Sequence, residues 1–249
     1  MDSNLLERYS RNIILREIGG MGQKRLSRSK ILIIGAGGLG NSSATYLAAS
    51  GVGKIGLVDP DVVSLSNLQR QVLFKERDIG KLKVESAKVQ LNALNPHTKI
   101  ETYPYKISEN NIEKIFIEYD LILDGSDNFS TRYLINKFCF IQKKPLLFGA
   151  ISQWDGQISL YDPIDGSACF ECLYPEAKTF NVEENCSNTG VLGPLVGVIG
   201  SLMSVEAIKF VVSAGSSLKN ELIIYEGLSG LMRRYKTCSR VECKVCGKI

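Results

Sequence analysis

Residues 30–40 read KILIIGAGGLG, a short apolar run followed by a glycine-rich turn. The run predicts a buried strand, and residues 39–50 beyond the turn are typical of a helix. Such a turn lets the backbone bend tightly and approach a phosphate, whose charge is favoured at a helix N-terminus. A glycine-rich packing turn is the alternative interpretation. The glycines that we expect at a nucleotide are Gly35, Gly37, Gly38 and Gly40.

Two aspartates follow the next predicted strand, residues 54–58. Asp59 closes that strand about 20 residues after the glycine turn, where a carboxylate accepts the hydroxyl groups of a ribose. Asp61 lies in the same VDPD sequence and belongs to the same predicted site. The turn with a strand on one side and a helix on the other therefore predicts a mononucleotide or dinucleotide site.

Strand-like and helix-like segments alternate as far as residue 151, which predicts right-handed crossovers and a mostly parallel sheet covered on both faces. Beyond that point strand-like segments surround a long helix near 191–212, which predicts an antiparallel extension. We expect an α/β, Rossmann-like fold in a single domain over 1–249, after a helical region at 1–28 that breaks at its paired glycines. Further strands are expected at 99–103, 120–123, 145–151, 157–161, 222–225 and 231–235, and further helices at 81–95, 109–118 and 129–142.

Polar and basic side chains cluster after the second strand. Asn67, Arg70 and Gln71 lie in LSNLQRQ, and Lys83 opens the next predicted helix. Cations beside an adenosine suit a triphosphate, because they stabilise the charge on a leaving phosphate, whereas hydride transfer has no such need. These residues favour ATP over the cofactor of a nicotinamide-dependent oxidoreductase, which remains the alternative. Solvated surface charges are the other interpretation.

An acidic loop, DGSDN, follows the predicted strand at 120–123 and therefore lies at the edge of the sheet where open α/β folds bind ligands. A carboxylate there can hold Mg²⁺ together with phosphate oxygens, and we expect Asp127 to do so. Asp127 is also a candidate N-cap of the helix that follows, and the two roles are compatible.

Four of the seven cysteines form two C-x-x-C pairs. Four thiolates in a tetrahedron make a closed structural Zn²⁺ site, while unpaired buried thiols or redox pairs are the alternative. Cys238 is a spare thiol that could compete as a ligand. The predicted zinc ligands are Cys169, Cys172, Cys243 and Cys246.

Composition narrows the class of protein. A net charge of +4 without a basic run argues against nucleic acid. The apolar stretch at 190–205 is interrupted by Pro194 and falls short of the roughly 20 residues of a membrane span, so we expect a helix in the core or in a subunit interface. The acidic, polar start argues against a secretory signal, and the cysteines indicate a reducing compartment, so the expected location is the cytoplasm.

The motifs RYSRNIIL, GAGGLG, VDPD, LSNLQRQ, GKLKVESA, DGSDN, CFECLYP and CKVCG together resemble the bacterial E1-like adenylyltransferases of the ThiF/MoeB/HesA family, in order and over essentially the whole chain. The resemblance implies one adenylation domain, with a nucleotide-binding half at 29–150 and a carrier-binding and zinc half at 151–249. It implies that ATP adenylates the C-terminal glycine carboxylate of a small β-grasp, ubiquitin-like sulfur carrier, giving an acyl-adenylate and pyrophosphate.

The resemblance also implies residue roles. Arg70 and Lys83 would bind phosphates, Asn67 and Gln71 would make neighbouring polar contacts, and zinc would occupy the two cysteine pairs. Arg11 matches an arginine that homodimers of the family supply to the ATP of the other subunit. No general base is required, because a carboxylate is already ionised at pH 7.

Cys186 matches a cysteine that in some relatives accepts the activated carrier or a persulfide sulfur. A thiol before a helix N-terminus favours thiolate, whereas the nearby Glu183 and Glu184 oppose it, so both outcomes stay open. A cysteine desulfurase or another sulfur donor is a further expected partner. The sequence does not separate a carrier of molybdopterin biosynthesis from one of thiamine biosynthesis.

Overall fold

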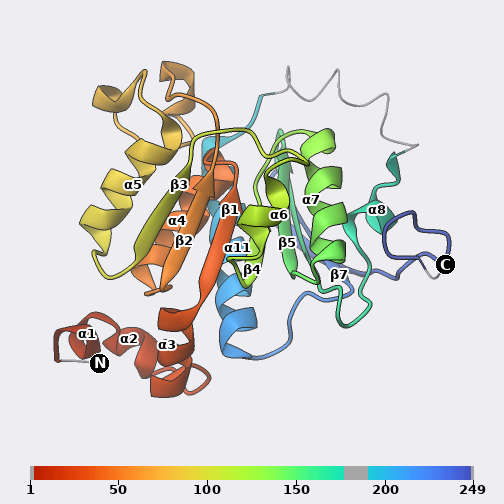
Figure 1. Cartoon of the computed structure of the whole chain (residues 1–249), viewed down its shortest axis with the longest axis horizontal. Helices are drawn as coiled ribbons and strands as arrows, with labels where there is room; N and C mark the ends of the chain where they lie inside the picture. Colours follow the sequence, from red (N-terminus) through yellow and green to blue (C-terminus); the bar gives the residue numbers. More distant parts are fainter. Residues whose placement is uncertain (1–2, 177–189, 248–249) are drawn as a thin grey trace.

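A twisted eight-stranded sheet forms the centre of a computed structural model of the chain, which describes residues 3–176 and 190–247 (Figure 1). The strand order is β3-β2-β1-β4-β5-β6-β7-β8; the first five are parallel, and β6 to β8 add on antiparallel. This is the mixed α/β sheet that the sequence predicts. The strands are β1 (Lys30–Ile34), β2 (Lys54–Val58), β3 (Lys99–Tyr103), β4 (Leu121–Asp124), β5 (Leu146–Ser152), β6 (Asp155–Tyr161), β7 (Glu221–Glu226) and β8 (Leu231–Lys236).

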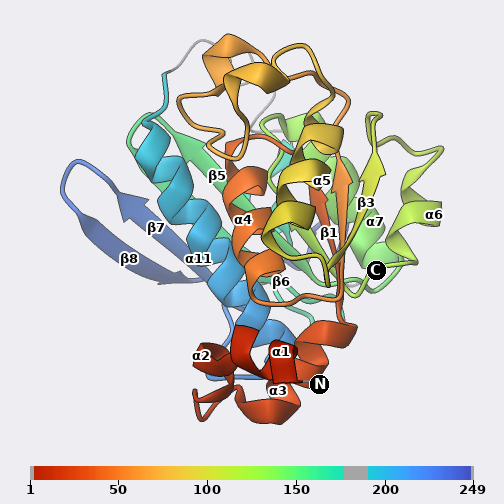
Figure 2. The same cartoon turned by 90° about the vertical axis from the view of Figure 1, so that its left-hand side faces the viewer.

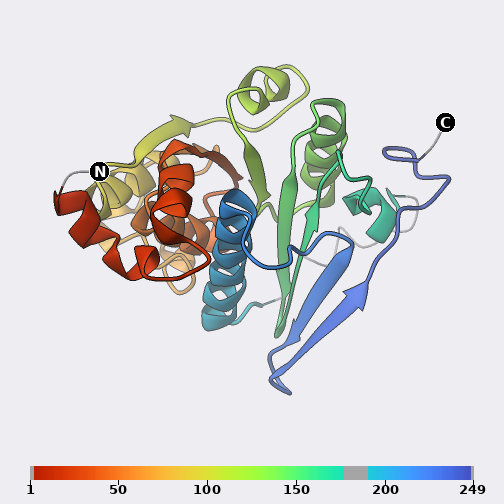
Figure 3. The same ribbon diagram turned by 90° about the horizontal axis from the view of Figure 1, so that it is seen from below.

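Helices cover both faces of the sheet, as Figures 2 and 3 show from two further directions. Side chains alternate along β1, so Ile31 and Ile33 join one apolar core while Leu32 and Ile34 join the other. Helices α3 (Gly19–Arg28), α4 (Gly38–Ala49), α5 (Lys83–Leu94) and α11 (Gly193–Val212) pack on the first core. Helices α6 (Ile112–Phe116), α7 (Phe129–Ile141) and α8 (Phe170–Leu173) pack on the second, while α1 (Ser3–Arg8) and α2 (Ser10–Ile13) precede α3.

The helical N-terminal region is interrupted next to the paired glycines, as predicted. Helix α2 ends at Ile13, and α3 begins at Gly19 and continues through Gly20. The turn is made at Gly19 itself, whose φ of 55° lies in the left-handed region that favours glycine. The glycines therefore start this helix rather than end one.

The long apolar helix α11 is a core element. By length and composition alone it passes the test for a membrane span, and half of its apolar window is buried inside the protein. It lies against α4, where a Cβ on Gly200 would come within 2.6 Å of Ser42 Cβ. Val196, Ile199 and Met203 are fully buried in the same packing layer. The prediction of a buried helix is confirmed.

Candidate functional site

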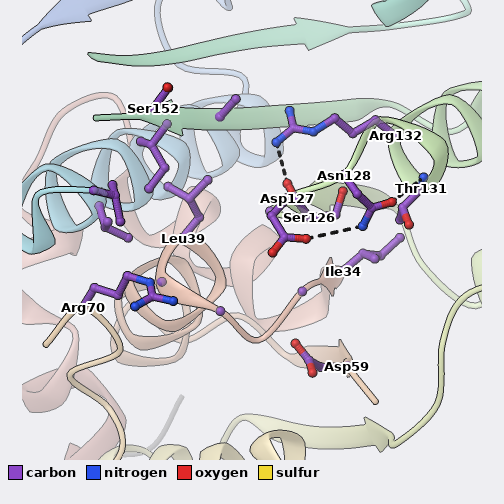
Figure 4. A pocket seen from close by; sticks show the side chains of 18 of the residues that line it. Ile34, Leu39, Asp59, Arg70, Ser126, Asp127, Asn128, Thr131, Arg132 and Ser152 are labelled. Atoms are coloured by element: carbon purple, nitrogen blue, oxygen red, sulfur yellow. Dashed lines mark hydrogen bonds between the residues drawn. The ribbon is translucent and has the colours of Figure 1, made fainter. Parts of the chain in front are cut away.

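A cleft of about 900 Å³ opens where the parallel strands end. Its walls come from the loops after β1, β2 and β4, the β5–β6 hairpin and the start of α11 (Figure 4). This is the carboxyl edge of the sheet, where open α/β folds bind ligands. Of the predicted site residues, the lining includes Gly35, Gly37, Gly38, Asp59, Asp61, Asn67, Arg70, Gln71, Lys83 and Asp127.

The glycine turn at the cleft floor is packed too tightly for side chains at two positions. Gly35 has a φ of 91°, and a Cβ there would lie 2.9 Å from the carbonyl oxygen of Gly125. A Cβ on Gly40 would lie 1.9 Å from the carbonyl oxygen of Gly35. These glycines let strand β1, helix α4 and the loop after β4 approach one another, and so they shape the site. Gly35 also lines the cleft, whereas Gly40 does not.

Gly37 differs from its neighbours because its free side faces the cleft. A Cβ there would meet only Gln71 Nε2, at 3.9 Å, whereas a Cβ on Gly38 would collide with Val196 at 2.3 Å. Gly37 is also the N-cap position of α4, so the first backbone N–H groups of that helix lie beside open space. The arrangement favours an anion at this point.

Asp59 ties the glycine turn to β2. Its carboxylate accepts hydrogen bonds from the backbone N–H groups of Ala36 and Asp61, both at 2.8 Å. Burial raises the pKa of Asp59, and the ammonium of Lys83, 4.0 Å away, opposes that rise. Lys83 is only 7% exposed and bonds more closely to the exposed carboxylate of Asp61, at 2.7 Å. A cation is thus held in place at the wall of the cleft.

The loop after β2 contributes a second cation and two amides. The guanidinium of Arg70 donates to the carbonyl oxygen of Ser66 at 3.0 Å. Asn67 accepts from the backbone N–H of Ser64 at 3.2 Å and so stabilises the short helical turn of the loop. Gln71 is 3% exposed, and its buried Oε1 has no hydrogen-bond partner among the described residues. Such an atom in a cleft wall fits a site completed by a ligand.

The acidic loop after β4 corrects one prediction. Asn128, not Asp127, is the N-cap of α7, and its Oδ1 accepts from the backbone N–H of Thr131 at 2.9 Å. Asp127 is exposed and contacts Asn128 Nδ2 at 3.4 Å, which leaves its carboxylate directed into the cleft (Figure 4). The capping role therefore falls to the neighbour, and Asp127 stays available to a ligand.

One further residue of this wall, Arg132, was missed as a site residue; Asp124 beside it in the structure is buried and does not line the cleft. Asp124 accepts from Ser126 N at 2.9 Å and Ser126 Oγ at 2.6 Å; burial raises its pKa, and Arg132 opposes the rise. Arg132 lies in the first turn of α7 and is 8% exposed. The sequence contained a signal for this burial. Arg132 is spaced three, four and seven residues from Ile135, Asn136 and Cys139, so it lies on the same face of the helix as these buried side chains.

The four predicted cysteine ligands converge. Their sulfur atoms lie within 4.8 Å of one another, with separations of 3.9, 3.6 and 3.4 Å for three of the pairs. A tetrahedron of sulfurs about 2.3 Å from a zinc ion has edges of about 3.8 Å, so the cluster fits that metal. The amide of Asn136 and the backbone N–H of Arg240 donate to two of the sulfurs, as outer partners of a metal site do. Cys238 is exposed and is not part of the cluster.

Two further predicted site residues are not among the described residues that line the cleft. Arg11 is exposed on α2, at the end of the sheet where β1 begins, and does not line the cleft (Figure 1). Cys186 lies outside the described residues.

Comparison with known proteins assigns the chain to a family. The family model described as the ThiF family matches residues 9–245, and the chain belongs to that family. It is 41% identical over 246 residues to the sulfur carrier protein adenylyltransferase of Thermus thermophilus, covering 97% of this chain and 91% of that one.

Two other matches bear on the site. Adenylyltransferase and sulfurtransferase MOCS3 of Aedes aegypti is 40% identical over 247 residues, which is 99% of this chain but 56% of the mosquito protein. The chain thus spans about half of that relative. A structure of E. coli MccB with ATP superposes with a TM-score of 0.85 at 28% identity, covering 96% of this chain and 73% of MccB.

Proposed function

We propose that the chain uses ATP to adenylate the C-terminal carboxylate of a small ubiquitin-like sulfur-carrier protein. One observation carries the proposal: Arg70, Lys83 and Asp127 face one cleft whose floor is the glycine turn. Two cations and a metal-competent acid suit a triphosphate. The Thermus relative carries this activity in its name, and the MccB structure contains ATP. The nicotinamide-dependent oxidoreductase is not supported by these relatives.

The reaction needs positioning and charge stabilisation. An oxygen of the carrier carboxylate forms a bond to the α-phosphorus of ATP, while the bond from that phosphorus to the bridging oxygen breaks and its electron pair leaves with pyrophosphate. Lys83 and Arg70 stabilise the phosphate oxygens on which charge builds, and Asp59 orients the ribose. The attacking carboxylate is already ionised near pH 7, so no residue has to remove a proton.

Metal ions complete the proposal. Asp127 would hold Mg²⁺ together with phosphate oxygens, which neutralises charge on the leaving pyrophosphate. The cysteine cluster would hold a structural Zn²⁺ that joins α8 to the C-terminal segment, and four thiolates leave that metal no open position for catalysis.

Other parts of the proposal concern partners. We propose a homodimer, since Arg11 matches an arginine that dimers of the family supply to the ATP of the other subunit and does not line the cleft of its own chain. The carrier belongs to a molybdopterin or a thiamine pathway, Cys186 is a candidate acceptor of the activated carrier or of sulfur, and a cysteine desulfurase or similar donor supplies that sulfur.

ATP–pyrophosphate exchange tests the activity. Exchange should require Mg²⁺ and a purified carrier ending in Gly-Gly, and should fall at least about 100-fold in Arg70→Ala and Asp127→Ala, which each remove transition-state stabilisation. Arg77→Ala, an exposed arginine outside the cleft lining, is the matched control and should exchange like the wild type. Binding of NAD(H) in place of ATP, or full exchange by both cleft variants, would refute the assignment.

A further inference from the structure

Arg132 is a buried cation of the cleft that the proposed reaction has not yet used. It lines the cleft from the first turn of α7 and is 8% exposed. In Figure 4 it lies on one side of Asp127, and Arg70 lies on the other. Among the cations of the lining, the proposed reaction uses Arg70 and Lys83 and leaves Arg132 and the exposed Lys106 without a role.

The surroundings of Arg132 fix its guanidinium but leave donors unused. One of its terminal nitrogens donates to the carbonyl oxygen of Ser126, and the guanidinium carbon lies 5.9 Å from the centroid of the Phe170 ring. The buried carboxylate of Asp124 balances its charge. A guanidinium has five N–H donors, and within the described residues the bond to Ser126 is the one that it makes. The remaining donors belong to a side chain that borders the cleft.

We propose that Arg132 binds the C-terminal carboxylate of the carrier as that group attacks ATP, an inference that rests on the proposed function. A guanidinium and a carboxylate form charge-assisted hydrogen bonds, which are about twice as strong as neutral ones. Arg132 would hold one carboxylate oxygen and leave the other directed at the α-phosphorus. The oxygen that it holds becomes the carbonyl oxygen of the acyl-adenylate, so the contact persists as the new bond to phosphorus forms and pyrophosphate leaves.

A binding experiment that compares two forms of the carrier, each with the wild-type enzyme and with single variants, isolates this contact. A purified β-grasp carrier ending in Gly-Gly is prepared with a free C-terminal carboxylate and, separately, with a C-terminal amide. Each form is titrated by calorimetry into the enzyme loaded with Mg²⁺ and α,β-methylene ATP, which cannot react. The wild type should bind the carboxylate at least about 10-fold more tightly than the amide. Arg132→Gln should bind both forms equally, and Arg77→Gln should keep the wild-type preference.

The outcomes separate this contact from a structural role and from the activity itself. Equal weakening of both carrier forms in Arg132→Gln would mean that Arg132 only holds the loop at Ser126, and an unchanged preference would mean that it does not reach the carboxylate. Either result overturns the inference. Arg132→Lys keeps the positive charge but lacks the planar guanidinium, so its preference for the carboxylate form over the amide form should be intermediate. This variant tests the inference if Arg132→Gln does not fold. Carrier-dependent exchange by the wild type, measured in parallel, reports the proposed function independently.

Discussion

The packing of the glycine turn gives a prediction whose size follows from the structure. Gly40 is the third residue of α4, and a Cβ added there would lie 1.9 Å from the carbonyl oxygen of Gly35 and 3.0 Å from its carbonyl carbon. Both are backbone atoms, so no side chain can rotate away. The same Cβ would also lie 3.3 Å from Ile33 in the strand below.

Gly40→Ala should therefore destabilise the protein. Overpacking costs about 1–3 kcal/mol, and a collision with backbone takes the upper end of that range. Alanine in a helix recovers about 1 kcal/mol relative to glycine. The net loss in the free energy of unfolding is about 2 kcal/mol, and the displaced turn should also weaken ATP binding because Gly35 and Gly37 shape the floor of the cleft.

Urea unfolding followed by circular dichroism measures the first effect, and calorimetric titration with ATP and Mg²⁺ measures the second. Gly197→Ala is the matched control, because it is also inside a helix and a Cβ there meets nothing within 4 Å. The control should gain up to about 1 kcal/mol. Equal stability changes for Gly40→Ala and Gly197→Ala would show that helix propensity, and not the contact with Gly35, decides the outcome.

Three further predictions concern charge and metal. Metal analysis of the purified protein should find one zinc ion per chain; Cys246→Ser should lose it and unfold at a lower temperature, whereas Cys238→Ser should retain it. Burial raises the pKa of Cys139, so the thiol stays protonated in the folded protein at a pH at which it ionises in the unfolded chain. The contribution of Cys139 to the free energy of unfolding is therefore complete below the unfolded pKa of about 8.5 and decreases as the pH rises above that value. The stability of the wild type relative to Cys139→Ala should thus fall by up to about 1.4 kcal/mol per pH unit in urea unfolding above pH 9, and a flat difference would refute that reading. Lys83→Gln should weaken ATP binding at least about 10-fold in calorimetry while Lys88→Gln, on the same helix, should not.

Local patterns were enough to predict the strands and most helices. The strands at 30–34, 54–58 and 99–103 have the predicted bounds. The first two are short apolar runs between polar turns, whereas the third, KIETY, has a single buried residue and lies at the edge of the sheet. The helix α11 was predicted to be buried because Pro194 and the charges that follow interrupt its apolar stretch; by length and composition it still passes the test for a membrane span, and its burial in the structure decides the matter. The hydrophobic periodicity of a segment and the turn-forming residues at its ends predict such elements, even when the elements that pack against them are unknown.

The site was predictable where a motif links chemistry to a fixed place in the fold. Asp59, Lys83 and the four cysteines lie where their spacing placed them. The N-cap at Asn128 was not predictable, because adjacent Asp and Asn residues both favour that position and only the backbone geometry decides between them. Arg132 was missed although its spacing places it on the buried face of α7, because the residues around it, Phe170 and Asp124, come from other elements of the sequence.

The charge of the cleft explains why an acidic wall suits a nucleotide. Asp59, Asp61, Asp127 and Asp155 line it together with Arg70, Lys83, Lys106 and Arg132, so among the described residues the formal charges cancel. A free triphosphate would bring four negative charges to such a surface, whereas its magnesium complex brings about half as many, and the N-terminus of α4 adds positive partial charge at the glycine turn. The cations proposed to bind phosphate are held before the ligand arrives, since Lys83 is fixed by Asp61 and Arg70 by Ser66. A preorganised, neutral cleft of this kind is expected to bind the metal–nucleotide complex more tightly than the free triphosphate, because the complex leaves fewer negative charges unbalanced.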